Sequence, residues 1–212
     1  MPSSPSIIGT STQTGDNVSG IDITLPGGIS SGDLIVIFCS CNATISTPTG
    51  GYTNLHTDYN VFHKVSGGSD SGATVTLSWG SKQYAAALAV VIGDGFVDTG
   101  STLAGSTSPG ATSTVTYTLV LRASLYNTAG ADFTPSDTIP SGTSYYTAIG
   151  NFDGSEKDAV VTLATETKAS SGVINTAAWT KGDLCATVVV GGPDSVGGGG
   201  GGGSGSAILL GV

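Results

Sequence analysis

The sequence predicts an all-β protein in which antiparallel strands form a sandwich of two sheets. Apolar segments follow one another along the chain, and several alternate apolar with polar residues, as in Ile21–Leu25 and Ala73–Trp79. Such alternation is typical of a strand with one buried face. Glycine, proline and serine separate the segments, and no stretch has a helical period of any length. About nine to eleven short strands joined in this way favour a jelly-roll or immunoglobulin-like sandwich.

The apolar segments predict the strands in chain order. Leu34–Cys39 is a continuous apolar run, which predicts a central strand buried on both faces. Gln83–Ile92 is rich in alanine, but its β-branched end and the flanking glycines favour a strand over a helix. Residues 93–110 are mainly glycine, serine and threonine, and we expect a long loop that crosses between the sheets. Further strands are expected at Val61–Val65, Thr112–Leu121, Thr143–Ile149, Ala159–Thr165, Val173–Trp179 and Leu184–Val190.

The composition divides the chain into three segments. Residues 1–20 are polar and predict an N-terminal arm or a first edge strand, and residues 21–192 form the predicted sandwich. Residues 193–212 form a glycine-rich tail, in which Gly197–Gly203 has no side chains to bury and is expected to act as a flexible tether. An apolar plug follows the tether, and we expect it to anchor the chain in a larger assembly: Ile208, Leu209, Leu210 and Val212.

Charge and targeting signals restrict the partners that we expect. Only 10% of the residues are charged and the formal net charge is -9, so there is little positive charge to bind nucleic acid or an anionic membrane. The N-terminus lacks the basic start and apolar stretch of a signal peptide, and no apolar run approaches the roughly 20 residues of a membrane span. The sequence therefore predicts a soluble protein made in a cytosol.

Candidate chemical groups are few, and each has a structural alternative. Cys39 and Cys41 lie on one face of a strand, and with Cys185 they are interpreted as small buried hydrophobic residues rather than a metal pair. His56 and His63 flank Asp58 and Asn60, a pattern that fits either a metal-dependent hydrolase or the wet face of a strand, and the second is favoured.

The segment 151–158 holds three carboxylates, which fits either a calcium loop or a solvated acidic turn. Its glycine lies at the wrong position for the calcium-loop template, so the solvated turn is favoured. No catalytic residue, metal site or cofactor is therefore expected.

Four aromatic residues are candidates for surface recognition. Tyr145 and Tyr146 are adjacent in a predicted strand, so one of them must face outward. An exposed ring can stack on a sugar or fill a pocket on a partner, and the alternative is a place at the rim of the core. The candidates are Tyr52, Trp79, Tyr145 and Tyr146.

The second half of the chain has the same kind of pattern as the first, with short apolar runs separated by turn residues. Gly182–Leu184 echoes Gly32–Leu34, since each triplet launches an apolar strand. The echo is too short to establish a duplication.

The motifs on which a resemblance to a known domain family depends lie in the first half of the chain. They are the entry Ile21–Pro26, the strand Gly32–Phe38, the turn Thr47–Tyr52 and the strand Val61–Val65. With these motifs, the segment resembles a β-sandwich domain family of bacterial and phage proteins. The Ser/Thr/Gly-rich composition and the glycine-rich tail are similar to those of tailed-phage virion accessory proteins.

The resemblance implies a non-enzymatic structural component on the surface of a bacteriophage virion. A head decoration protein on the capsid is the first expectation, and a tail or fibre accessory protein is a close second. The expected partners are capsid or tail proteins and further copies of this chain, with no nucleic acid and no membrane. The alternative is a carbohydrate-binding module for host cell-surface glycans, which would use the four aromatic residues.

Overall fold

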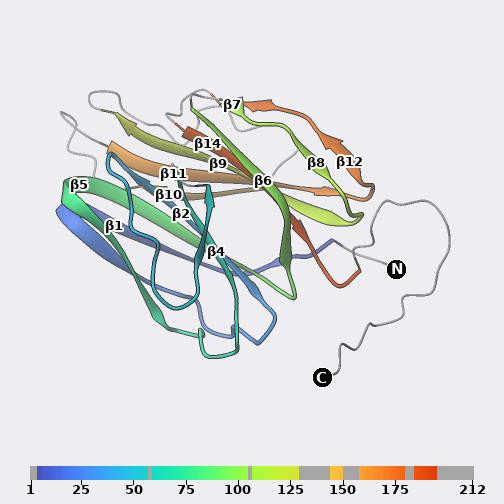
Figure 1. Ribbon diagram of the computed structural model, residues 1–212, viewed down its shortest axis with the longest axis horizontal. Coiled ribbons are helices and arrows are strands. Elements are labelled where there is room, and N and C mark those ends of the chain that lie inside the picture. The colour runs from blue at the N-terminus through green and yellow to red at the C-terminus, as the bar shows by residue number, and fades with distance from the viewer. Residues whose placement is uncertain are drawn as a thin grey trace, which may run out of the picture.

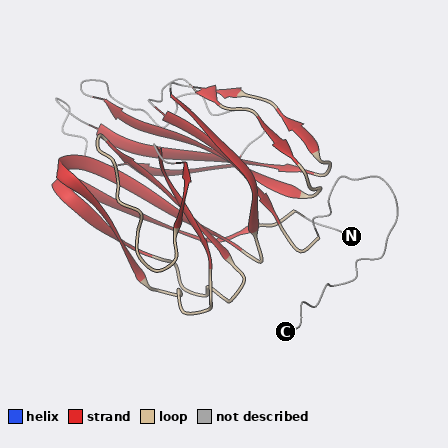
Figure 2. Cartoon of the chain, in the orientation of Figure 1, coloured by secondary structure: helices blue, strands red, loops and turns tan. Residues whose placement is uncertain are grey.

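The computed structural model describes residues 4–56, 59–104, 107–128, 144–149, 158–179 and 184–194. In these segments every regular element is a strand and none is a helix (Figure 2). Two five-stranded antiparallel sheets lie face to face, with short strand pairs beside the second sheet (Figure 1). The prediction of an all-β protein built from antiparallel strands is confirmed.

The strands form two large sheets and two small ones. The first sheet has the order β1-β5-β2-β4-β3 and consists of β1 (Ile7–Thr24), β2 (Leu34–Cys41), β3 (Thr53–His56), β4 (Tyr59–Val65) and β5 (Thr74–Ile92). The second has the order β10-β11-β9-β14-β6 and consists of β6 (Phe96–Ala104), β9 (Thr118–Thr128), β10 (Ser144–Ile149), β11 (Asp158–Lys168) and β14 (Leu184–Gly191). The small sheets pair β7 (Thr107–Ser108) with β13 (Ala177–Ala178), and β8 (Ala111–Ser113) with β12 (Gly172–Ile174).

The two large sheets repeat one topology. Counted along the chain within each sheet, the five strands are β1 to β5 in the first and β6, β9, β10, β11 and β14 in the second. Both sheets then have the same spatial order: first, fifth, second, fourth, third. We call residues 7–92 the N-terminal unit and residues 96–191 the C-terminal unit.

The pairing register also repeats. In the N-terminal unit, Leu34 at the start of the second strand lies opposite Ile92 on the fifth. In the C-terminal unit, Leu119 of the second strand lies opposite Val190 on the fifth. Leu34 and Leu119 therefore correspond, as do Ile92 and Val190. The echo seen in the sequence is not this repeat, because Leu184 begins a fifth strand whereas Leu34 begins a second strand.

The two units contact each other through several strands. The first strand of each unit contacts the third strand of the other, since β1 lies against β10 and β6 lies against β3. The two second strands, β2 and β9, lie against each other. The fourth strand of the C-terminal unit, β11, also lies against β5 and β2, so the fifth and second strands of the N-terminal unit both face it.

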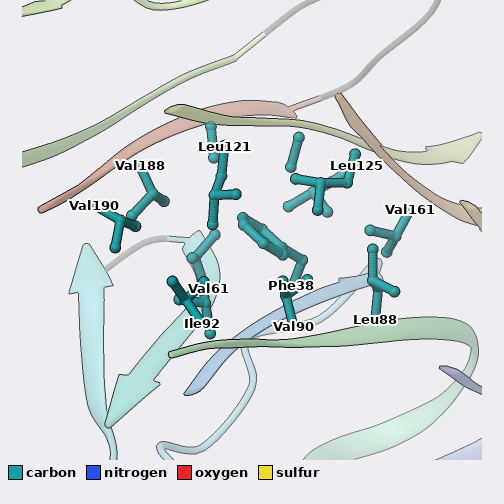
Figure 3. Packing of buried hydrophobic residues seen from close by; sticks show 14 of the residues in the cluster. Phe38, Val61, Leu88, Val90, Ile92, Leu121, Leu125, Val161, Val188 and Val190 are labelled. Carbon is teal, nitrogen blue, oxygen red and sulfur yellow. The ribbon is translucent and has the colours of Figure 1, made fainter. Parts of the chain in front are cut away.

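The main core lies between the two sheets and draws on both units (Figure 3). The first sheet contributes Phe38, Val61, Leu88, Val90 and Ile92. The second sheet contributes Leu121, Leu125, Val161, Val188 and Val190. All ten side chains are buried, so each sheet has one apolar face sealed by the other unit.

In each unit, a two-stranded ribbon covers the outer face of the sheet. One arm of the ribbon belongs to or follows the first strand, and the other arm belongs to or precedes the fifth strand. In the N-terminal unit, β1 and β5 pair from Ile7 to Thr24, with register shifts between Ile7 and Gly9 and between Gly15 and Gly20. The residues beyond this irregular stretch pack on the outer face of the sheet, and they include Ile21, Ile23, Val75 and Leu77. In the C-terminal unit the ribbon is divided into the short pairs β7–β13 and β8–β12.

Three expectations for the chain course differ from the structure. Residues 93–110, expected to be a loop, contain β6 and β7, because an edge strand can pair through its backbone without an apolar sequence. The strand expected at Thr112–Leu121 is interrupted, since Tyr117 has φ 52° between β8 and β9. The expected boundary at residue 20 falls inside β1, which runs along the edge of the first sheet.

Candidate functional site

The outer face of the sheet differs between the two units at corresponding positions. In the N-terminal unit, the second strand β2 places three apolar residues in the cluster beneath the ribbon: Ile35, Ile37 and Cys39. Counting from the matched pair Leu34 and Leu119, the corresponding residues of β9 are Val120, Arg122 and Ser124. A continuous apolar layer in one unit therefore has a polar centre in the other.

The neighbouring strands of the C-terminal unit extend this polar centre. On β14, Thr187 lies opposite Arg122, and on β11, Thr162 lies opposite Ser124. In the N-terminal unit, the partners of Ile37 are Ala89 on β5 and Phe62 on β4, both buried. We call Arg122, Ser124, Thr162, Glu166 and Thr187 the polar layer.

Arg122 is the centre of the polar layer and the only arginine of the chain. Its side chain is 4% exposed and that of its ion-pair partner Glu166 is 22% exposed. The Nη2 of Arg122 donates to Glu166 Oε1 at 2.8 Å and to the backbone carbonyl of Asn175 at 2.8 Å. The Nε and Nη1 of the same guanidinium have no hydrogen-bond partner in the described part of the chain.

A second polar group of the layer is also unpartnered. The hydroxyl of Thr162 is buried and finds no partner among the described residues. The hydroxyl of Thr187, by contrast, donates to the carbonyl of Pro109 at 2.7 Å. The layer thus combines satisfied groups with hydrogen-bonding capacity that the described chain leaves unused.

The polar layer explains why the ribbon of the C-terminal unit is divided. Pairing stops at Pro109 and Gly110 on one arm and at Asn175 and Thr176 on the other. The carbonyls of Pro109 and Asn175 are the ones that accept from the polar layer beneath. Buried polar side chains need partners, so these carbonyls satisfy them instead of continuing the ladder.

A shallow groove of about 410 Å³ lies beside the same ribbon. It is lined by Thr99 of β6, by residues 110–112, and by Val173 and Ile174 of β12. Val173 is 74% exposed, the largest value among the big apolar side chains that the structure describes. Ile174 beside it is buried against Val120, so the groove has a firm apolar base.

Two of the aromatic residues predicted for surface recognition are buried. Tyr52 is 9% exposed and Trp79 is 5% exposed, and both pack in the cluster under the N-terminal ribbon. Their burial argues against the surface-recognition role and agrees with the alternative, a place at the rim of the core, because the ribbon closes this face of the sheet. Tyr145 and Tyr146 lie in β10, and their side chains fall outside the described residues.

The remaining candidate groups form no site that the structure describes. His63 is half-buried, and burial lowers the pKa of its imidazole. The side chain of His56, most of the acidic segment 151–158 and the apolar plug of the tail lie outside the described residues. No group of three histidine, cysteine or acidic side chains in the described segments is placed to hold a metal ion. Within the same segments, no helix is long and apolar enough to span a membrane.

Sequence reasoning missed the polar layer. A signal was present, since the only arginine stands within the run Leu119–Leu125, in which every other residue except Ser124 is apolar. A charge in such a run indicates a buried and paired group rather than a surface group. Comparison of the chain with known proteins found no matching family model, no matching curated protein and no matching solved structure.

Proposed function

We propose that this chain is a non-enzymatic structural protein of a bacteriophage virion that joins its neighbours through its C-terminal tail. The observation that carries this proposal is the groove beside β8 and β12, where Val173 stands 74% exposed above a buried apolar base. The groove places an exposed apolar side chain on the surface of the sandwich, next to a buried apolar base.

The proposed occupant of the groove is the apolar plug of a second copy. The tail leaves the structure after Asp194, and residues 195–207 reach at most about 45 Å. That distance is enough to cross from one subunit to an adjacent one. The plug residues are Ile208, Leu209, Leu210 and Val212.

The energetics favour a weak contact that is repeated many times. Burying the four plug side chains contributes roughly 6 to 10 kcal/mol. Ordering the run Gly197–Gly203 costs about 1 kcal/mol or more for each residue, which cancels most of that gain. A single tail therefore binds weakly, and firm attachment requires several tails acting together. A particle surface with many copies provides that condition.

The virion setting rests on the sequence resemblance and on the low surface charge. A head decoration protein that contacts the capsid is the first choice, and a tail or fibre accessory protein is the second. Mass spectrometry of purified virions separates them, because hundreds of copies indicate the head and a few copies indicate the tail. The absence of the chain from virions would overturn the setting.

Self-association of the full chain tests the groove and its occupant. We expect sedimentation velocity to show association that increases with concentration. A triple tail variant, I208S/L209S/L210S, and the groove variant Val173→Lys should each remove it. The matched control is Val65→Lys, which places the same charge at an exposed valine of the N-terminal unit and should associate normally. Equal association in the tail variant and the native chain would overturn the proposal.

A further inference from the structure

The guanidinium of Arg122 has more donors than the described chain satisfies. Its Nε and Nη1 carry three N–H groups, and neither nitrogen has a partner in the described segments. The side chain is only 4% exposed, so bulk solvent does not reach these groups. An unpaired donor in such surroundings costs about 1–3 kcal/mol, and the cost is higher on a charged group. The polar layer is therefore built around an acceptor that the described residues do not supply.

The fold itself does not require this arginine. The corresponding residue of the N-terminal unit is Ile37, which is fully buried in an apolar layer of the same topology. Replacement of a buried ion pair by well-packed apolar residues is often neutral or stabilising. The C-terminal unit thus has a buried charged group, which costs folding free energy, at a position where the N-terminal unit has an apolar residue. A binding role accounts for that difference.

The donors define the chemistry of the missing acceptor. Planar guanidinium groups pair best with planar oxyanions, because their N–H groups match two oxygens at once. Glu166 already balances the charge of Arg122, so a singly charged group is accommodated with less repulsion than a doubly charged phosphate. The hydroxyl of Thr162, on the same face of the sheet and unpartnered, supplies a further donor.

We propose that Arg122 and Thr162 form a binding site for a carboxylate group, beneath the break in the ribbon of the C-terminal unit. The carboxylate accepts from the free guanidinium nitrogens and from the threonine hydroxyl. Its two sources are a small free organic acid and an acidic side chain of a partner protein. This site is independent of the tail and the groove, so either proposal stands if the other fails.

The single arginine makes the test direct. In a proton–nitrogen NMR spectrum of the full chain, the arginine Nε–H region contains one signal, and that signal belongs to Arg122. We expect titration with acetate, at constant ionic strength against chloride, to shift this signal in a saturable manner. Succinate should act similarly, and inorganic phosphate should bind at least tenfold more weakly.

Variants separate binding from folding. Arg122→Ile copies the residue of the N-terminal unit and should fold, but it should lose the rise in melting temperature that acetate gives the native chain. Thr162→Val should weaken acetate binding severalfold while the arginine signal remains. The matched control is Lys82→Met, which removes one exposed positive charge from the N-terminal unit and should respond to acetate as the native chain does.

The binding measurements decide whether the proposal holds and whether the carboxylate comes from a free acid or from a partner protein. Binding of acetate supports a free acid, while binding only of a peptide that carries glutamate or aspartate supports a protein partner. An arginine signal that is already protected and does not respond to any acid means that a carboxylate or water of the protein itself fills the site. That result would overturn the proposal, as would equal stabilisation of Arg122→Ile and the native chain by acetate.

Discussion

Trp79 and Trp179 are related hydrogen-bond donors, since each donates its indole N–H to the opposite arm of the ribbon in its own unit. Trp79 Nε1 lies 2.8 Å from the carbonyl of Val18 on β1, and Trp179 Nε1 lies 2.6 Å from the hydroxyl of Ser108 on β7. Both rings are buried. The two acceptors correspond as well, since each lies eleven residues beyond a matched position at the start of its arm, Ile7 and Val97.

This relationship predicts that each tryptophan stabilises its ribbon by linking the two arms. We expect Trp79→Phe and Trp179→Phe each to lower the free energy of unfolding by about 1–2 kcal/mol, because each loses one buried hydrogen bond and part of a ring. Urea denaturation measures both values. A loss confined to one of the two variants would contradict the equivalence of the ribbons.

The N-terminal ribbon tolerates no side chain at Gly20. A Cβ at this position would lie 2.8 Å from the backbone carbonyl of Leu77, which cannot move without breaking the pairing. Gly20→Ala should therefore destabilise the protein by about 1–3 kcal/mol. Gly27→Ala is the matched control, since a Cβ there meets no atom within 4 Å. Equal stability of the two variants would show that the ribbon is not held closely at this point.

Asp70 should make part of the stability sensitive to acid. Burial raises the pKa of its carboxyl, but hydrogen bonds from Lys64 and Ser66 outweigh burial and hold the pKa below its usual value. Lys64 Nζ lies 2.7 Å from Asp70 Oδ1 and stacks over the ring of Tyr52 at 5.6 Å. A carboxyl with a lowered pKa in the folded state stabilises it above the unfolded pKa of about 3.9, and this stabilisation is lost as pH falls through the folded value.

The variant Asp70→Asn isolates this contribution. We expect it to be less stable than the native chain at pH 6, and the difference should narrow as the pH falls below about 4. Thermal denaturation between pH 6 and pH 2.5 measures the difference. A difference that stays constant with pH would show that the carboxylate form of Asp70 is not what stabilises this loop.

Cys41 should be the reactive thiol of the chain. A hydrogen bond from Cys39 lowers the pKa of the Cys41 thiol, and the same contact raises the pKa of Cys39. Cys39 and Cys185 are fully buried, whereas Cys41 is half-buried. Because the thiolate is the reactive form, iodoacetamide should modify Cys41 at least tenfold faster than the others under native conditions. Mass spectrometry of peptides reads the order, and Cys39→Ala should slow the modification of Cys41.

Periodicity predicted the strands whose side chains alternate or are uniformly apolar. The runs that became β2, β11, β14 and the second part of β5 were located because their residues pack on both faces, and the alternating run Ala73–Trp79, expected as a separate strand, forms the first part of β5. The edge strand β6 was missed because its pairing depends on the backbone, and a Gly/Ser/Thr sequence carries no periodic signal for it. The sequence did not decide between surface and core for Tyr52 and Trp79, because the face on which they pack is closed by the far parts of β1 and β5, which local patterns do not place over the sheet.

Local sequence patterns did not predict the repeated strand order or the polar layer. The two units share strand order and register, but at matched positions they carry residues as different as Ile37 and Arg122. Only the pairing of the strands places Arg122, Thr162 and Thr187 on one face, since they come from three strands distant in sequence. An isolated arginine in an apolar run was the one sign available without the structure.

Joining two equivalent units in a single polypeptide frees them to differ. A pair of separate identical chains would show every substitution twice, so its two broad sides would always match. Here the second strand of one unit has an isoleucine under a continuous ribbon, and the second strand of the other has an arginine under a divided one. The two outer faces of the molecule are consequently different. A neighbouring protein that binds only one of these faces determines the orientation of the molecule.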